Sequence, residues 1–490
     1  MKAIVFPVAS DDDDTLYEAL CSRDARFDGA FFFGVTSTGV YCRPLCPSRT
    51  PLRRNCRFFP LAAAAQDAGF RPCLRCRPEL APSVHHAAAD DVATRLVSLL
   101  RQAALDGGSL EDVAQQSGWS ARQLRRRIAT ECGTTPGSIM RTERLLFAKR
   151  LLHDTDLGMS EVALRSGFRS VRRFNTEVSQ KYGMTPGAIR GRHGGELASG
   201  PIRLRLDYRP PYAWPEMLDW LRARATRGVE IVTADSWIRS VRFGDQVGWL
   251  RVTPDPTRDA LVVEVSAGLT RVLPQVVRRL RGLFDLDANP GVMLPVFEND
   301  SLLGEVAARF PGLRIPGAWD IFETSVRTIL GQQVTVAAAT TVAGRLVAKL
   351  GETCRSNPHG LEYYAVTPAA LAAATVDELA ALGMPGKRAL ALQGLARHDL
   401  IGGLDFPPFA TLDEVSSSLT RLPGIGPWTA DYIAMRALRH PDAFPAGDIA
   451  LRKALGKGEA VSPAAAETAS QRWRPWRAYA AALLWQSLKP

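Results

Sequence analysis

The spacing of apolar residues changes along the chain and divides it into four regions. Residues 15–80 contain short apolar runs typical of β-strands, and residues 85–193 carry apolar residues at helical spacing together with many arginines. Residues 203–316 alternate strand-like and helical patterns, whereas residues 317–490 show Ala- and Leu-rich helical periodicity. These periods predict several domains with both α and β structure, which fits a length of 490 residues.

The remaining segments are expected to be connections. Residues 1–14 include four consecutive aspartates and are expected to form a loose leader, and residues 193–200 have the Gly- and Ser-containing composition of a linker. No apolar run approaches the ~18 residues needed to cross a membrane. The start of the chain also lacks the apolar stretch of a signal peptide. We therefore expect a cytoplasmic monomer with no membrane partner.

The net charge of +11 favours a polyanionic partner. Nucleic acid is the default partner for so basic a chain. An unspecialised basic surface is the alternative, so charge alone does not decide between them.

Part of the helical region is duplicated. Residues 112–119 recur with changes as residues 161–168, and each copy has a Ser-Gly-aromatic turn followed by an Arg-rich helix. The second of these helices is expected to carry Arg169, Arg172 and Arg173. A glycine turn between two short helices is typical of a helix-turn-helix, whose second helix enters the major groove. A solvated charged helix face is the alternative for any single run. The pair resembles the AraC-type DNA-binding region. Its candidate DNA contacts are Arg122, Arg125, Arg126, Arg169, Arg172 and Arg173.

Cysteines are concentrated near the start of the chain, where six of the eight lie within the first 76 residues. In a reducing compartment such a cluster indicates metal or thiol chemistry rather than disulfides. Two close pairs, Cys42 with Cys46 and Cys73 with Cys76, have the spacing of a tetrahedral zinc site. Spacing alone also fits a purely structural zinc ion, because so small a domain needs extra stabilisation.

The sequence around these cysteines, residues 34–49 and 69–76, resembles the amino-terminal domain of the Ada family of methyl-phosphotriester repair proteins. The resemblance implies zinc at all four cysteines, and it implies that Cys42 accepts a methyl group from a damaged DNA phosphate. Zinc keeps the sulfur as a thiolate, which is the nucleophilic form. Methylation would remove one negative charge from a cluster that repels DNA, so we expect a switch that strengthens binding to promoter DNA.

A second motif lies in the last region. Gly424 and Gly426 flank Ile425 directly before a helical run, and Asp448 follows in a Gly- and Pro-containing loop. Such a hairpin presents backbone N–H groups and a helix N-terminus to phosphates without reading sequence. Hairpin, loop and acid together resemble the helix-hairpin-helix glycosylase superfamily, which implies that Asp448 is catalytic. Asp448 is also placed to cap the helix that follows it, and the two roles are compatible.

Aromatic residues near these motifs form the expected base pocket. Indole faces favour cationic alkylated purines by stacking and cation–π contacts, although each ring could equally be part of an ordinary core. Residues 210–214 and 474–485 resemble the AlkA branch, the alkyladenine glycosylases, and this resemblance covers residues 203–490. The expected pocket residues are Trp428, Tyr432, Trp485 and Trp220.

Three positions differ from the patterns of that superfamily. Trp428 occupies the place where bifunctional members carry a Schiff-base lysine, so we expect a monofunctional hydrolase. The residue that intercalates into DNA, usually leucine, is here Gln333, and the residue after the acid, usually aromatic, is Ile449. The last two differences bear on the range of substrates.

These observations predict a multidomain α+β protein. It would contain a small α/β domain built around zinc, an all-α double helix-turn-helix, an AlkA-type α+β domain and an all-α helix-hairpin-helix glycosylase domain. The expected function is repair of alkylated double-stranded DNA by a monofunctional DNA-3-methyladenine glycosylase, joined to a half that accepts methyl groups from methyl-phosphotriesters and binds promoter DNA. The alternatives are a damage-sensing transcriptional regulator without glycosylase turnover, and a general DNA-binding protein with a structural zinc ion.

Overall fold

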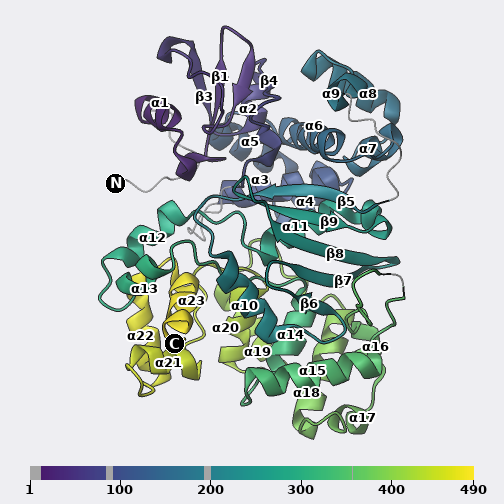
Figure 1. Cartoon of the computed structure of the whole chain (residues 1–490), viewed down its shortest axis with the longest axis vertical. Helices are drawn as coiled ribbons and strands as arrows, with labels where there is room; N and C mark the ends of the chain where they lie inside the picture. The colour runs from purple at the N-terminus through teal and green to yellow at the C-terminus, as the bar shows by residue number, and fades with distance from the viewer. Residues whose placement is uncertain (1–12, 84–91, 192–199, 356, 490) are drawn as a thin grey trace.

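The computed structural model describes residues 13–83, 92–191, 200–355 and 357–489 (Figure 1). The expected linker at residues 193–200 lies outside these ranges except for Gly200, as does most of the expected leader. The last two of the four aspartates, Asp13 and Asp14, belong to the first turn of helix α1 (Asp13–Ser22), where acids interact favourably with the helix dipole.

The first region contains a four-stranded sheet of order β3-β1-β2-β4. β1 (Phe32–Val35) pairs antiparallel with β2 (Val40–Cys42) and β3 (Cys56–Phe59), and β2 pairs parallel with β4 (Arg71–Pro72). The register places Cys42, the last residue of β2, opposite Phe33 of β1. Helix α2 (Ala62–Asp67) covers this sheet.

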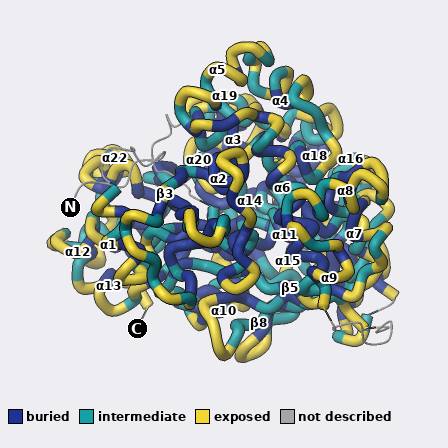
Figure 2. The backbone as a smooth tube through the Cα atoms, turned by 90° about the horizontal axis from the view of Figure 1, so that it is seen from above, coloured by how far each residue is buried: buried dark blue, intermediate teal, exposed yellow. Residues whose placement is uncertain are grey.

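Seven helices form the second region and repeat one arrangement around a long central helix. Figure 2 shows the first of the two Arg-rich helices, α5, at an exposed edge of the molecule. The central helix, α6, is largely buried. The helices are α3 (Val92–Leu105), α4 (Leu110–Ser117), α5 (Ala121–Cys132), α6 (Pro136–Asp154), α7 (Met159–Arg165), α8 (Val171–Tyr182) and α9 (Pro186–Arg190).

The turns of the two repeats follow from their residues. Gly118 ends α4 with φ 70°, a left-handed conformation that glycine adopts without steric cost, and Gly167 takes φ 78° at the matching place. The side chains of Ser120 and Ser170 then accept backbone N–H bonds at the starts of α5 and α8. Both copies are therefore helix-turn-helix units, as the duplication predicts.

The third region is built on a five-stranded antiparallel sheet of order β5-β9-β8-β7-β6. Helices α10 (Trp214–Arg224) and α11 (Leu273–Leu283) accompany it. The strands are β5 (Ile202–Asp207), β6 (Glu230–Val232), β7 (Trp237–Phe243), β8 (Gln246–Pro254) and β9 (Ala260–Val265).

The last region is helical, and its core includes two helices from before the predicted boundary at residue 316. α12 (Pro290–Glu298) and α13 (Gly304–Arg309) contribute Met293, Phe297 and Ala307 to that core. The other helices are α14 (Ile321–Leu330), α15 (Val336–Leu350), α16 (Pro368–Ala373), α17 (Val376–Ala380), α18 (Gly386–Leu400), α19 (Leu412–Thr420), α20 (Pro427–Arg436), α21 (Ile449–Leu455), α22 (Pro463–Ser470) and α23 (Arg477–Ser487).

The regions share their cores. The second helix-turn-helix and the five-stranded sheet bury one continuous apolar cluster, in which Phe174 of α8 and Val263 of β9 are both fully buried. Within the ranges given above, no helix combines the length and apolarity that crossing a bilayer requires. The multidomain α+β architecture expected from the sequence is confirmed.

Candidate functional sites

The four predicted cysteines converge on one point. The sulfur atoms of Cys42, Cys46, Cys73 and Cys76 all lie within 4.8 Å of one another, and all four residues are buried. Two strands and the turns after them bring the pairs together, since β2 ends at Cys42 and β4 leads into Cys73. Four thiols at these separations fit a tetrahedral metal ion. The chain therefore contains a metal site.

Backbone donors reach two of the four sulfurs. The N–H of Arg43 donates to Cys76 Sγ at 3.4 Å, and the N–H of Arg75 donates to Cys73 Sγ at 3.3 Å. Such bonds stabilise the thiolate and so reduce its nucleophilicity. Within the part of the chain that the structure describes, no hydrogen bond from outside the cluster reaches Cys42 Sγ. Exposure does not distinguish the sulfurs, because Cys42 and Cys73 are 6% and 8% exposed.

The residue after Cys42 joins the metal domain to the five-stranded sheet. The guanidinium of Arg43 forms an ion pair with Asp28, and its Nη1 lies 3.0 Å from Asp207 Oδ2 at the end of β5. Nearby, the buried Arg209 donates to the carbonyl oxygens of Asp28 and Asp287, at 2.9 and 2.7 Å. The sequence carried no signal for this interface, because its partners lie far apart in the chain.

The predicted arginines of the two helix-turn-helix units are exposed, as DNA contacts must be. On α5, Arg122, Arg125 and Arg126 face solvent. On α8, Arg172 and Arg173 are exposed, and Arg173 Nε lies 2.7 Å from Glu177 Oε1. Placing Arg169 on this helix was wrong, because Ser170 caps α8 and Arg169 lies in the turn before it.

The glycine hairpin connects α19 to α20 as expected. Gly424 has φ 83°, and a Cβ there would lie 2.7 Å from Ala391 Cβ, so both conformation and space require glycine. Gly426 precedes α20 without a side-chain cap and has open space around it. Ile425 is buried in the core and its N–H donates to Leu422 O at 3.1 Å, so Gly424 and Gly426 are the exposed residues of the hairpin. The hairpin thus presents backbone N–H groups and a helix N-terminus to solvent.

The difference in backbone conformation and free space between Gly424 and Gly426 predicts that alanine at the two positions has unequal effects on stability. Gly424→Ala should lower the free energy of unfolding by about 1–3 kcal/mol, because it combines backbone strain with a clash against Ala391. Gly426→Ala should lower it by less, since its φ is ordinary and its Cβ meets nothing within 4 Å. Urea unfolding of both variants measures the difference. Equal losses would contradict the role assigned to Gly424.

Asp448 lies where the loop after α20 turns into α21. Its Oδ1 accepts the backbone N–H groups of Ala450 and Leu451, at 2.9 and 3.1 Å, so it caps α21. The indole N–H groups of Trp428 and Trp485 donate to its two carboxylate oxygens, both at 3.2 Å. Four donors therefore hold this carboxylate in one orientation beside a cavity of about 1150 Å³ that it lines.

The aromatic residues expected in the pocket line this cavity. Ring centroids are 5.7 Å apart for Trp428 and Tyr432, 6.1 Å for Tyr432 and Trp485, and 5.2 Å for Trp485 and Trp220. The face of Trp220 is not free, however, because the guanidinium carbon of Arg224 lies 3.5 Å from its ring centroid. Trp220 therefore supports the other rings more than it offers a stacking surface.

The rim of the cavity contains Gln333 and a neighbour that the sequence did not single out. Gln333 is exposed between α14 and α15 with φ 56°, an uncommon conformation outside glycine. The side-chain amide of Gln332 donates to Gly424 O at 2.8 Å and to Thr429 Oγ1 at 3.0 Å. The backbone carbonyl oxygen of Gln332 accepts a hydrogen bond from Arg388 at 2.5 Å. Gln332 thus fixes the position of Gln333 relative to the hairpin.

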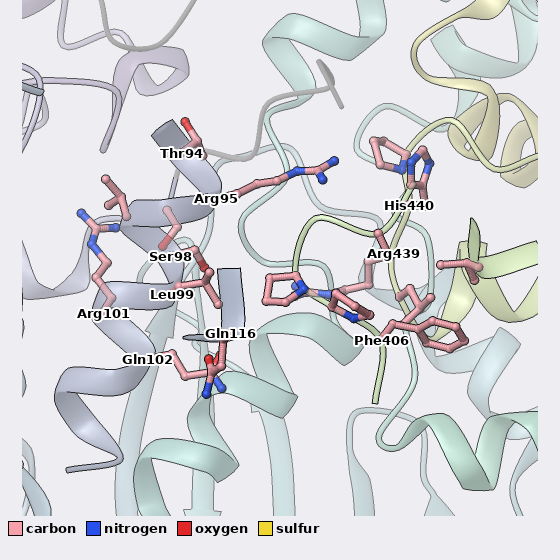
Figure 3. A pocket seen from close by; sticks show the side chains of 18 of the residues that line it. Thr94, Arg95, Ser98, Leu99, Arg101, Gln102, Gln116, Phe406, Arg439 and His440 are labelled. Carbon is pink, nitrogen blue, oxygen red and sulfur yellow. The ribbon is translucent and has the colours of Figure 1, made fainter. Parts of the chain in front are cut away.

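A second cavity, of about 940 Å³, separates the helix-turn-helix region from the helical carboxyl-terminal region. Figure 3 shows Arg95 of α3 on one wall, with Arg439 and His440 on the other. Since residues 437–441 follow the carboxyl end of α20, this cavity lies at the opposite end of that helix from the glycine hairpin. It was not predicted.

Comparisons with known families match four successive parts of the chain. Residues 15–79 match the metal binding domain of Ada, and residues 113–192 match a helix-turn-helix domain. Residues 203–320 match the AlkA N-terminal domain, and residues 326–478 match the HhH-GPD superfamily of base excision DNA repair proteins.

Individual relatives show the same organisation. A protein of Mycobacterium tuberculosis (strain CDC 1551 / Oshkosh), named a probable bifunctional transcriptional activator/DNA repair enzyme AlkA, is 38% identical over 98% of this chain and 97% of its own length. DNA-3-methyladenine glycosylase 2 of Escherichia coli (strain K12) is 38% identical over 57% of this chain and 95% of its own. A solved structure, 3-methyladenine DNA-glycosylase from Archaeoglobus fulgidus, superposes with a TM-score of 0.51 at 23% identity, covering 58% of this chain and 97% of that one.

Proposed function

Because the chain belongs to the family of bifunctional transcriptional activator/DNA repair enzymes of the AlkA type, we propose that its carboxyl-terminal half excises alkylated bases from double-stranded DNA at Asp448. The protein is an alkylation-repair DNA glycosylase with a regulatory half. The position of Asp448 supports this assignment: four donors fix its carboxylate beside an aromatic cavity and the glycine hairpin.

The reaction follows from this arrangement. The hairpin and the N-terminus of α20 hold the DNA backbone, and the damaged nucleotide rotates out of the duplex into the cavity. When the N-glycosidic bond breaks, its electron pair moves onto the base and C1′ of the sugar becomes positive. The carboxylate of Asp448 stabilises that charge. The oxygen of water then bonds to C1′ and gives up a proton, which leaves an abasic site.

The same geometry predicts release of free base without strand cleavage. Trp428 stands where a Schiff-base lysine would be needed, and its indole N–H is directed to Asp448. Borohydride added during turnover should therefore trap no covalent enzyme–DNA adduct. In a parallel reaction without borohydride, the product strand should stay intact until hot alkali cleaves it, which serves as the control that an abasic site was formed. A trapped adduct would contradict the monofunctional assignment.

For the regulatory half, we propose that zinc occupies the cysteine site and that Cys42 accepts the methyl group of a methyl-phosphotriester. The donor set supports zinc, since four thiolates are typical of its structural sites. Cys42 is favoured as acceptor because Cys73 and Cys76 receive backbone N–H bonds and the side chain of Ser48 hydrogen-bonds to Cys46. The two helix-turn-helix units then carry the exposed arginines that would contact promoter DNA.

A damage-sensing regulator without turnover is the second candidate function. It would need a pocket that binds a flipped base but cannot stabilise a sugar cation. The carboxylate of Asp448, held at the cavity by four donors, and the intact hairpin do not favour it, and base release by the purified protein separates the two candidates.

A further inference from the structure

The base cavity contains an arginine, Arg224, that has no role in the reaction described above. Arg224 is the last residue of α10 and lines the cavity beside the aromatic rings. The guanidinium of Arg224 lies over the ring of Trp220, with its central carbon 3.5 Å from the ring centroid. This contact holds a flexible side chain in one place, so the position of its charge is defined.

Arg327 and Arg436 also line the cavity near Arg224. Arg327 donates to the carbonyl oxygens of Ala339 and Arg224 and to Thr340 Oγ1. The N–H groups of Arg436 are likewise directed to the protein. They donate to the carbonyl oxygens of Pro316 and Gly317 and, at 2.7 Å, to Tyr432 Oη. Arg224, by contrast, makes a long hydrogen bond of 3.4 Å to Trp220 O and a contact with the Tyr432 hydroxyl. A guanidinium has five N–H groups, so Arg224 retains donors that can face a ligand.

The charge around Arg224 is positive on balance. The nearby carboxylate, Asp448, already accepts four hydrogen bonds from indoles and backbone amides. Two other cavity acids, Glu230 and Glu323, form ion pairs with Arg239. Burial raises the pKa of Tyr432, yet Arg436 and Arg224 outweigh it and the pKa of Tyr432 is lowered, which is independent evidence of a positive field at this wall.

We infer that Arg224 contributes to base specificity: it donates a hydrogen bond to an acceptor atom of the flipped base and raises the rate of release of neutral damaged bases relative to cationic ones, opposing the preference of the aromatic rings for cations. This inference rests on the proposed glycosylase function. Neutral lesions such as hypoxanthine carry a carbonyl oxygen and ring nitrogens that accept hydrogen bonds, whereas N-alkylation occupies a ring nitrogen and adds positive charge.

The chemistry of departure gives the reason. A cationic base receives the electron pair of the glycosidic bond and leaves neutral, so it needs no help from a cation. A neutral base that receives the same pair leaves as an anion and afterwards takes a proton from water. A fixed guanidinium stabilises that anion in the transition state and repels a cationic base in the ground state. Both effects act in the same direction on the ratio of the two rates.

The test is single-turnover release of hypoxanthine and of 7-methylguanine from duplexes of matched sequence. In Arg224→Met, which keeps the alkyl stem over Trp220, the ratio of the hypoxanthine rate to the 7-methylguanine rate should fall about tenfold or more, the size expected for a hydrogen bond to a charged group. Arg224→Lys should recover part of the ratio. Arg222→Met is the matched control, since Arg222 lies on the same helix and pairs with Asp219 away from the cavity, and it should leave the ratio unchanged.

Each other outcome overturns the inference. Equal loss on both bases would mean that Arg224 only supports Trp220, and thermal melting of Arg224→Met and Arg224→Lys would show whether folding is the cause. A rise in the ratio would mean that the guanidinium occupies the place of a cationic base instead of assisting a neutral one. If the unsubstituted protein releases neither base, the proposed glycosylase function fails, which is distinguishable from failure of the role of Arg224.

Discussion

Asp448→Asn should slow release of alkylated bases by roughly 100-fold or more, because a neutral amide cannot stabilise the charge that develops at C1′. The substitution keeps an oxygen that can cap α21, so the fold and the affinity for duplex DNA should change little. Release of radiolabelled base under single-turnover conditions measures the effect.

A matched substitution controls for the loss of a helix cap. Asp320 caps α14 in the same way, accepting the backbone N–H of Glu323, but it does not line the cavity. Asp320→Asn should therefore keep near-normal activity. If Asp448→Asn retained more than a tenth of the activity, Asp448 would not be the residue that stabilises the sugar cation.

Cys42→Ser should abolish methyl transfer from methyl-phosphotriester DNA, and methylation of the unsubstituted protein should raise its affinity for promoter DNA. Removing one negative charge at about 8 Å from a phosphate contributes roughly 2 kcal/mol at an effective dielectric constant of about 20, before screening by salt. A gain of about tenfold in affinity is therefore expected. Mass spectrometry locates the methyl group, and binding is measured before and after transfer.

The control for this experiment is Cys56→Ser. Cys56 is a buried cysteine outside the cluster, and its thiol donates to Leu52 O. This variant should accept the methyl group normally. Transfer to Cys42 without a change in affinity would leave repair in place and remove the switch, whereas no transfer to any cluster cysteine would make the metal site purely structural.

Local patterns predicted much of the fold and of the candidate sites. The spacing of Cys42, Cys46, Cys73 and Cys76 predicted one cluster because thiol pairs only a few residues apart can share a metal. The glycine hairpin was recognisable because φ 83° at Gly424 requires that residue type. Features of this kind depend on neighbours in the sequence, so the sequence contains them.

The parts that were missed depend on contacts between distant residues. Arg43 contacts Asp207 across two domains, and Arg224 covers one ring face of Trp220, which had been expected as a base-pocket residue. Arg169 was wrongly expected on α8 because the N-cap of that helix is Ser170, which follows Arg169 in the chain. Composition and periodicity carry no information on such packing, because they do not specify which residues distant in the sequence come into contact.

The central claim, that this chain excises alkylated bases, is tested most directly by incubating the purified protein with methylated duplex DNA and separating the released products by chromatography. Free 3-methyladenine and other alkylated bases should appear in solution, with the DNA strand intact and an abasic site at each position of loss. Methylated DNA that is bound but yields no free base would contradict the claim and would favour a regulator that only senses damage.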